Sequence, residues 1–138
     1  MEVRNAVYPP PEQAMQFFGG AEDGPFVMVN LLKFKEKAEY ADGSDAHLTG
    51  AEAYARYAVE VRKLVEGLGG AIRYGGQVTG LLIGEVEDLW DMVALAEYPS
   101  LAAFQQMAMS PQMHAIEHHR TAGLAGQLNI RTRPGEGF

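Results

Sequence analysis

One stretch constrains the fold more than any other: residues 25–34 read Pro-Phe-Val-Met-Val-Asn-Leu-Leu-Lys-Phe. Apolar and polar residues do not alternate here, so a strand formed by this stretch is apolar on both faces. Such strands lie in the middle of a sheet and are covered on both sides. Asn30 interrupts the run, and a buried amide without a partner costs about 1–3 kcal/mol. We expect a bulge or a cross-strand hydrogen bond at Asn30, or a contact with a ligand.

The clearest helical pattern begins at Thr49. Thr49 and Glu52 match a capping box, in which each side chain satisfies the backbone N–H of the other residue. Apolar residues then recur every three to four positions to about Leu68, which predicts an amphipathic helix that ends at Gly69 and Gly70. Its apolar face carries Tyr54, Tyr57, Ala58, Val61, Leu64, Val65 and Leu68.

Caps, glycines and apolar runs define the remaining elements. We expect a loose arm or edge strand over 1–8, a helix at 11–18, a polar solvated flap at 35–48, a strand at 71–84 broken at Gly75 and Gly76, a strand at 90–98, helices that begin after Ser100 and Ser110, and a strand at 124–133. After the arm and first helix, the order is strand, helix, strand, strand, helix, strand. This order is typical of the split βαβ, or ferredoxin-like, arrangement. The predicted fold is α+β, with a four-stranded antiparallel sheet and an extra N-terminal helix.

The 138 residues are predicted to form a single domain. Residues 1–24 are the arm and short helix, 25–133 the ferredoxin-like core, and 134–138 a tail. An open sheet this apolar needs its second face covered. We therefore expect a homodimer.

Composition narrows the classes of function. Cysteine is absent, which excludes disulfides, thiolate catalysis and cysteine-based metal sites. The net charge is −7 and no basic cluster exceeds Lys33, Lys35 and Lys37, so we expect no nucleic-acid partner. No apolar run approaches about 18 residues, so we expect no membrane span. The N-terminal residues lack an apolar signal core, and with the absence of cysteine this predicts a cytoplasmic protein.

Three of the four histidines lie between residues 110 and 124. His114 and His118 are four residues apart, as metal-binding pairs often are. On a helical wheel, however, Met113 and Ile116 define the inner face, and both histidines point outward. We therefore expect no metal site. Haem needs an inward axial histidine, so we expect no haem and no other cofactor.

Arg120 lies with the apolar residues on the same wheel. A buried guanidinium needs acceptors, and it is the natural partner of a carboxylate. One interpretation is an internal salt bridge to Glu97 or Glu117, or a contact with the carbonyls at the end of the helix. The other is an anion hook for a small carboxylate or phenolate, with His119 as the acid or base beside it. His119 and Arg120 are thus the candidate catalytic residues.

Further candidates lie on the sheet and on the long helix. Tyrosine and tryptophan need partners for their polar tips when they are buried. Tyr54, Tyr57, Trp90 and Tyr98 either fill the core or line a cleft together with Asn30. Arg73 is either an exposed edge charge or a second anion contact. The candidate ligand-binding residues are Asn30, Tyr54, Arg73 and Trp90.

The chain resembles the domain of unknown function 1330 family, in particular its longer bacterial members. The matching residues are Phe26-Val-Met-Val-Asn-Leu-Leu-Lys-Phe34, Ala53-Tyr54-Ala-Arg-Tyr57, Gly69-Gly70, Glu97-Tyr98-Pro99-Ser100, Ser110-Pro111 and His118-His119-Arg120-Thr-Ala-Gly-Leu124. The resemblance implies a dimeric α/β-barrel, in which two ferredoxin-like protomers pair their sheets and keep their helices outside. That superfamily includes cofactor-independent monooxygenases, isomerases, haem-degrading enzymes and ligand-sensing domains. The family carries no agreed reaction, so the resemblance assigns no catalytic residue.

Two hypotheses of function follow. In the first, Asn30, Tyr54, His119 and Arg120 converge in one pocket between sheet and helices. The protein is then a cofactor-free isomerase or monooxygenase-like enzyme that acts on a small polar or aromatic acid. In the second, the chain is a non-catalytic ligand-binding or structural homodimer.

Overall fold

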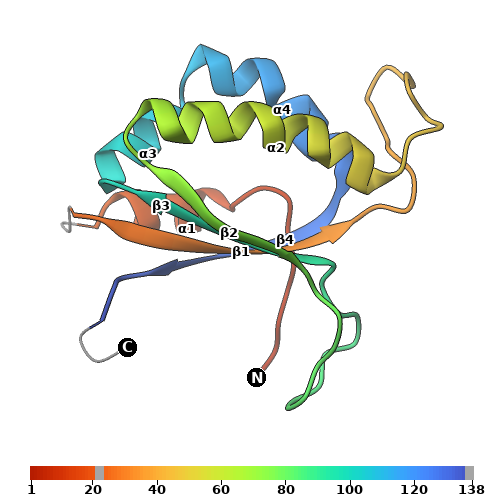
Figure 1. The fold of residues 1–138 in the computed structure, drawn as a ribbon, viewed down its shortest axis with the longest axis horizontal. Coiled ribbons are helices and arrows are strands. Elements are labelled where there is room, and N and C mark those ends of the chain that lie inside the picture. The colour runs from red at the N-terminus through yellow and green to blue at the C-terminus, as the bar shows by residue number, and fades with distance from the viewer. Residues whose placement is uncertain (21–23, 136–138) are drawn as a thin grey trace.

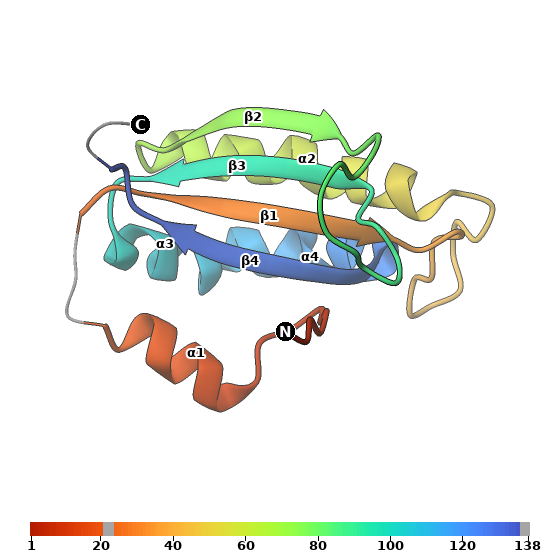
Figure 2. The same cartoon turned by 90° about the horizontal axis from the view of Figure 1, so that it is seen from below.

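The computed structural model describes residues 1–20 and 24–135 (Figure 1). The elements are α1 (Pro11–Phe18), β1 (Phe26–Phe34), α2 (Gly50–Gly67), β2 (Ala71–Gln77), β3 (Met92–Tyr98), α3 (Leu101–Ala108), α4 (Pro111–Gly123) and β4 (Leu124–Thr132). The strands form one antiparallel sheet in the order β2-β3-β1-β4. Helices α2, α3 and α4 cover one face (Figures 1 and 2). The predicted ferredoxin-like α+β fold with an extra N-terminal helix is confirmed.

Strand β1 is central, as its sequence predicts, because it pairs with both β3 and β4. Phe26, Met28 and Leu32 are buried beneath the helices. Val27, Val29 and the other alternate residues of β1 point to the opposite face. Figure 2 shows the sheet from that side, with no helix in front of the strands. Within one chain, β1 is therefore covered on one face only.

The capping box predicted for α2 is present. Thr49 Oγ1 accepts from the Glu52 backbone N–H at 3.1 Å, and Glu52 Oε1 accepts from the Thr49 N–H at 2.9 Å. Helix α2 packs along α4, and Tyr57 and Val65 are buried on its inner face. The helical wheel of this segment thus identified the face that covers the sheet.

The prediction of a strand over 71–84 is wrong beyond Gln77. Strand β3 begins only at Met92, and the backbone of residues 78–91 is bonded at its base, where Val78 N–H donates to Asp91 O at 2.9 Å and Asp91 N–H donates to Leu32 O of β1 at 2.8 Å. These residues form a loop that projects past the sheet (Figure 1). Leu82 and Ile83 at its tip are 96% and 85% exposed. An apolar run predicts a strand only where a neighbouring strand satisfies its backbone.

Residues 35–48 form a largely exposed loop without helix or strand, as predicted, but the loop is anchored to the helices at one point. Ala38 is buried, and its N–H donates to Leu48 O at 2.9 Å. The Glu39 N–H donates to Ala122 O at the end of α4, also at 2.9 Å. Ala38 packs with Ala122 and Ala53 of α2, and this small apolar contact fastens the polar loop to the helices.

Helix α1 lies beside the β4 edge of the sheet (Figure 2). None of its residues is buried, and Phe17 and Phe18 contact the ring of Phe104. The arm before α1 makes one bridge to β4, from Ala6 N–H to Gln127 O at 3.3 Å. Residues 21–23 of the predicted N-terminal segment and 136–138 of the predicted tail lie outside the described residues. No helix of the described residues is long and apolar enough to cross a membrane.

Candidate functional site

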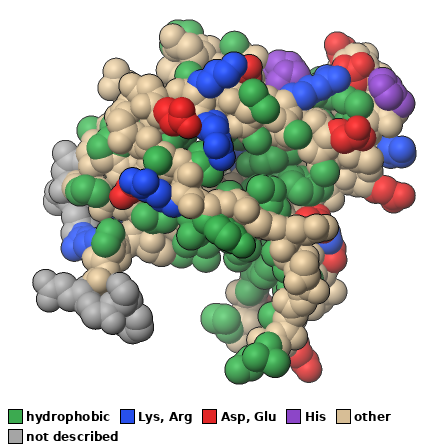
Figure 3. Space-filling model, viewed as in Figure 1, with side chains coloured by type: hydrophobic (Ala, Val, Ile, Leu, Met, Phe, Trp, Pro, Cys, Tyr) green, Lys and Arg blue, Asp and Glu red, His purple; other side chains and the backbone are tan. Residues whose placement is uncertain are grey.

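A pocket of about 450 Å³ lies between the helices and the sheet. Figure 3 shows the surface hollowed between α2 and the sheet, with hydrophobic side chains inside the hollow. Every strand and every helix of the described residues contributes to its lining. The pocket therefore occupies the place between sheet and helices where the sequence predicts a cleft.

One part of the pocket is apolar. Tyr98 and Phe104 pack with their ring centroids 4.7 Å apart, and Phe17 and Phe18 of α1 close the same region. Met28 lies among these rings. This part can hold a flat or aliphatic body through contact alone.

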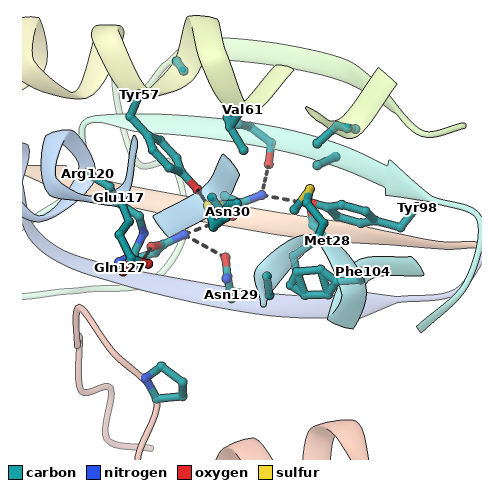
Figure 4. A pocket seen from close by; sticks show the side chains of 18 of the residues that line it. Met28, Asn30, Tyr57, Val61, Tyr98, Phe104, Glu117, Arg120, Gln127 and Asn129 are labelled. Atoms are coloured by element: carbon teal, nitrogen blue, oxygen red, sulfur yellow. Dashed lines mark hydrogen bonds between the residues drawn. The ribbon is translucent and has the colours of Figure 1, made fainter. Parts of the chain in front are cut away.

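The other part carries a connected polar network (Figure 4). Arg120 Nη2 donates to Val7 O at 2.7 Å and to Gln127 Oε1 at 2.6 Å. Gln127 Nε2 donates in turn to Asn30 Oδ1 at 3.0 Å and to Asn129 Oδ1 at 2.8 Å. The network fixes the Arg120 side chain against the sheet and against the N-terminal arm.

The cross-strand hydrogen bond expected at Asn30 is present. Its Nδ2 donates to Ala94 O on the neighbouring strand and to Met28 O, each at 3.2 Å. Its side chain also lines the pocket. The amide that interrupts the apolar strand is thus satisfied across the sheet and is part of the site.

Arg120 has no salt bridge among residues 1–20 and 24–135, because none of their carboxylate oxygens lies within 4.0 Å of its guanidinium. Glu97, one predicted partner, instead accepts from Arg73 Nε at 2.7 Å. Both hydrogen bonds of Arg120 use Nη2. Its Nε–H and the hydrogens of Nη1 have no hydrogen-bond partner among the described residues. The site thus contains a half-buried cation with unused donors.

Two tyrosines of the pocket, Tyr54 and Tyr57, lie close enough to this cation for its charge to act on their hydroxyls. Burial raises the pKa of Tyr54, while the nearby Arg120 opposes that rise to a smaller extent. Burial likewise raises the pKa of Tyr57 and Tyr98. No described residue forms a hydrogen bond with the Tyr54 hydroxyl, which lines the pocket. At neutral pH these phenols stay protonated and are donors rather than bases.

Glu117 lines the pocket too, although the sequence suggested it only as a partner for Arg120. It lies three residues before Arg120, so the helical wheel already placed the two residues close together on one face. Gln127 and Asn129 were missed by the sequence analysis. Their signal was alternation along β4, which puts both side chains on the same face as Asn30 in the paired strand β1.

His119 does not join Arg120 in the pocket, so the predicted convergence of these two residues is wrong. Its Nδ1 lies 2.7 Å from the Tyr40 hydroxyl, and its ring centroid lies 3.9 Å from that of His118. Consecutive helical residues point about 100° apart, so Arg120 faces the pocket while His119 turns to the 35–48 loop. The sequence could not place this loop, and Tyr40 on it takes the histidine.

Two predicted ligand contacts lie outside the pocket lining. Arg73 is exposed and pairs with Glu97, as expected for an edge charge. Trp90 Nε1 donates to Asn5 Oδ1 at 2.7 Å, and this bond ties the N-terminal arm to the end of the long loop. His114 and His118 are exposed, as the wheel predicts.

The position of His119 predicts a pH dependence of stability. Burial lowers the pKa of His119, and the neighbouring His118 adds to this effect. His119 then binds a proton more tightly in the unfolded chain than in the folded chain. Its contribution to the free energy of unfolding is therefore complete above about pH 6.5 and is lost as the pH falls below that value. We expect the urea midpoint to fall between about pH 7.5 and pH 5.5, and the fall to be smaller in His119→Gln. His114→Gln, at an exposed histidine, is the control. Equal pH slopes for His119→Gln and the unmodified protein would contradict the prediction.

Comparison with solved structures gives two close likenesses. The crystal structure of methylated RPA0582 protein is 37% identical, covers 96% of this chain and 97% of its own, and superimposes with a TM-score of 0.88. A second structure, of RPA0582 from Rhodopseudomonas palustris, is described as a protein of unknown function. It is 36% identical over 96% of this chain and 99% of its own, with a TM-score of 0.86.

A DABB family protein with a ferredoxin-like fold from Mesorhizobium loti is more distant. It is 15% identical, covers 81% of this chain and 98% of its own, and has a TM-score of 0.48. No protein-family model matches the sequence. Comparison with curated proteins gives no match either. The two likenesses above 30% identity extend over nearly the whole of both chains, and the chain therefore belongs to the same family as RPA0582 of Rhodopseudomonas palustris.

Proposed function

We propose that the pocket binds a small organic acid with a hydrophobic body, and that Arg120 holds the acid group. The observation that carries this proposal is the half-buried guanidinium without a carboxylate partner among the described residues. Removing a cation from water is costly, and neutral acceptors such as Val7 O and Gln127 Oε1 compensate only in part. A bound carboxylate would add charge-assisted hydrogen bonds at the unused donors.

The remainder of the pocket suits the hydrophobic body of such a ligand. Its volume of about 450 Å³ lies within the roughly 300–1,000 Å³ of typical small-molecule sites. Tyr98, Phe104 and Met28 supply apolar contact surface, and the polar groups gather around Arg120. A few placed polar groups in a mainly apolar cavity are the usual pattern of a specific ligand site.

Binding has more support than turnover. The isomerase or monooxygenase-like alternative used His119 as its acid or base, and His119 bonds Tyr40 outside the pocket. The pocket tyrosines have raised pKa values and are poor bases at neutral pH. Of the described residues that line the pocket, only Glu117 carries a carboxylate. Glu117 is therefore the candidate general base among the described residues of the lining.

Calorimetric titration with 3-phenylpropanoate and its amide tests the acid site. We expect the acid to bind and the neutral amide to bind much more weakly. A hydrogen bond to a charged group contributes about 1.5–3 kcal/mol, so Arg120→Gln should lower the affinity for the acid by about tenfold to a hundredfold. Arg73→Gln removes an exposed arginine outside the pocket and should change nothing. Equal affinity for acid and amide, or full affinity in Arg120→Gln, would refute the proposal.

We also propose that the chain forms a homodimer through its uncovered sheet face. In the strand register, Leu31 lies beside Val93 and Leu128, and Val29 lies beside Leu95 and Ile130. Tyr74 extends this apolar surface on β2, and Tyr74 and Ile130 are 57% and 45% exposed. An apolar patch of this kind marks an interaction site. Pairing two such faces gives the dimeric α/β-barrel expected of the domain of unknown function 1330 family, to which we propose that the chain belongs.

Light scattering tests the dimer. We expect a mass about twice that of the 15.0 kDa chain. Leu31→Asp places a charge in the middle of the uncovered face and should return the mass to that of one chain. Val59→Asp, at an exposed position on α2, should leave the dimer intact. A mass of 15.0 kDa for the unmodified protein at micromolar concentration would exclude the interface.

A further inference from the structure

The Glu117 carboxylate is the feature of the pocket that binding of a simple acid leaves unexplained. It is half-buried, and no described residue forms a hydrogen bond or ion pair with its side chain. An ionised carboxylate offers two acceptor oxygens and costs free energy when it is removed from water without donors. None of the described residues supplies a cation or a hydrogen-bond donor to the Glu117 carboxylate.

Glu117 and Arg120 would normally form a salt bridge on one helix. Their three-residue spacing puts their Cβ atoms about 5–6 Å apart. They do not pair, because Arg120 is drawn to Val7 O and Gln127 Oε1 instead. Both side chains therefore line the same cavity from α4 without pairing with each other (Figure 4).

Tyr57 lies close to both charges. Burial is the main cause of the raised pKa of Tyr57, and the charges of Arg120 and Glu117 act on it in opposite directions. The rings of Tyr54 and Tyr57 are 5.4 Å apart and face the same region. Tyrosine faces attract cations, so a positive group beside Glu117 would gain from these rings as well.

Resting on the proposed function, we propose that the natural ligand is an amphiphilic amino acid or a related acid that carries an ammonium group beside its carboxylate. Arg120 binds the carboxylate and Glu117 binds the ammonium. The hydrophobic side chain enters the apolar part of the pocket, between Met28, Tyr98 and Phe104. A simple acid pairs with Arg120, but its carboxylate then lies near the unpaired negative charge of Glu117. A zwitterion pairs with both residues.

Three matched probes test this assignment by calorimetric titration. L-Phenylalanine carries both charged groups, 3-phenylpropanoate lacks only the ammonium, and 2-phenylethylamine lacks only the carboxylate. Tryptophan and leucine, each with its desamino acid, extend the series to a larger and a smaller body. We expect the amino acid to bind at least about tenfold more tightly than its desamino acid. The amine should bind more weakly than the amino acid.

Variants separate the two charges. Glu117→Gln should remove the preference for the amino acid while the desamino acid keeps or gains affinity. Arg120→Gln should lower the affinity for the amino acid and for the desamino acid alike. Glu66→Gln, an exposed position on α2, should change neither. The melting temperature of Glu117→Gln should stay close to that of the unmodified protein, because the Glu117 side chain has no partner to lose.

The outcomes distinguish this inference from the proposal beneath it. If no amino acid of the series binds more tightly than its desamino acid, or if Glu117→Gln keeps the preference, the assignment of Glu117 is overturned. Arg120-dependent binding of 3-phenylpropanoate would then still support an acid site. If neither the acids nor the amino acids bind, both proposals fail.

Discussion

Replacing Gly123 with alanine is expected to lower the free energy of unfolding by more than about 3 kcal/mol. Gly123 is the last residue of α4 and lies against the first turn of α2. A Cβ at this position would collide with Gly50 O and would lie 2.9 Å from Tyr54 N and 3.2 Å from Tyr54 Cβ. Two of these three atoms belong to the backbone and cannot rotate away, so the helices would have to separate.

The contact between Gly123 and the first turn of α2 also holds the segment that connects β1 to α2. The Lys35 N–H donates to Gly123 O at 2.8 Å, and the Gly50 N–H donates to Lys35 O at 3.1 Å. A shift of α4 would stretch both bonds. It would also move Arg120 and Tyr54, which approach the pocket from these two helices. We therefore expect the acid affinity to fall together with the stability.

Urea denaturation followed by circular dichroism measures the loss. Gly67→Ala is the matched control, because Gly67 ends α2 and a Cβ there would meet nothing within 4 Å. That variant should keep the stability or raise it by about 0.5–1 kcal/mol, since alanine is the better helix former. A loss below about 1 kcal/mol in Gly123→Ala would mean that the two helices slide apart without strain.

Local sequence rules sufficed for most of the fold. The capping box at Thr49 and Glu52, the serine cap at Ser110 and the doubly apolar strand at 25–34 each predicted an element that the structure contains. These signals work because a cap or an apolar face is satisfied by residues close in sequence or by burial in general. The order of the elements then left the ferredoxin-like sheet as the natural arrangement.

What the sequence could not supply was the partner of each segment. Residues 78–84 resemble a strand, but no neighbouring strand reaches them. The 35–48 loop is polar, yet a single small residue, Ala38, anchors it. The helix turns His119 away from Arg120, and the residue that meets its ring, Tyr40, comes from that loop. In each case the outcome depends on a contact between segments far apart in the chain.

The residues of the candidate site likewise include some that the sequence indicated and one that only the strand register reveals. Asn30, Tyr54 and Arg120 were recognisable because each is a polar group on an apolar face. Gln127 was not recognisable, because its role depends on the register that sets β4 beside β1. Once that register is known, Gln127 becomes the connection between the helix-borne cation and the central strand.

Gln127→Leu is therefore expected to lower the free energy of unfolding by about 2 kcal/mol or more, through groups left without partners. Gln127 is 9% exposed, and its amide serves Arg120, Asn30 and Asn129 at once. Without it, Asn30 Oδ1 and one donor of Arg120 lose their partners inside the protein. Arg120 also loses one of its two anchors, so the acid should bind less tightly because the guanidinium is no longer held in place.

A double-mutant cycle with Arg120→Leu isolates this connection. Each single variant leaves the other side chain without its partner. The double variant Arg120→Leu with Gln127→Leu removes both side chains. Its loss of stability should therefore be smaller than the sum of the losses in the two single variants. We expect a coupling of at least about 1 kcal/mol from urea denaturation. Asn129→Ala is the control, since Asn129 is exposed and water can replace its bond to Gln127, at a cost below about 1 kcal/mol. Additive losses in the cycle would mean that Gln127 supports the strand but does not position Arg120, and the acid site would then have to be organised by the N-terminal arm through Val7 alone.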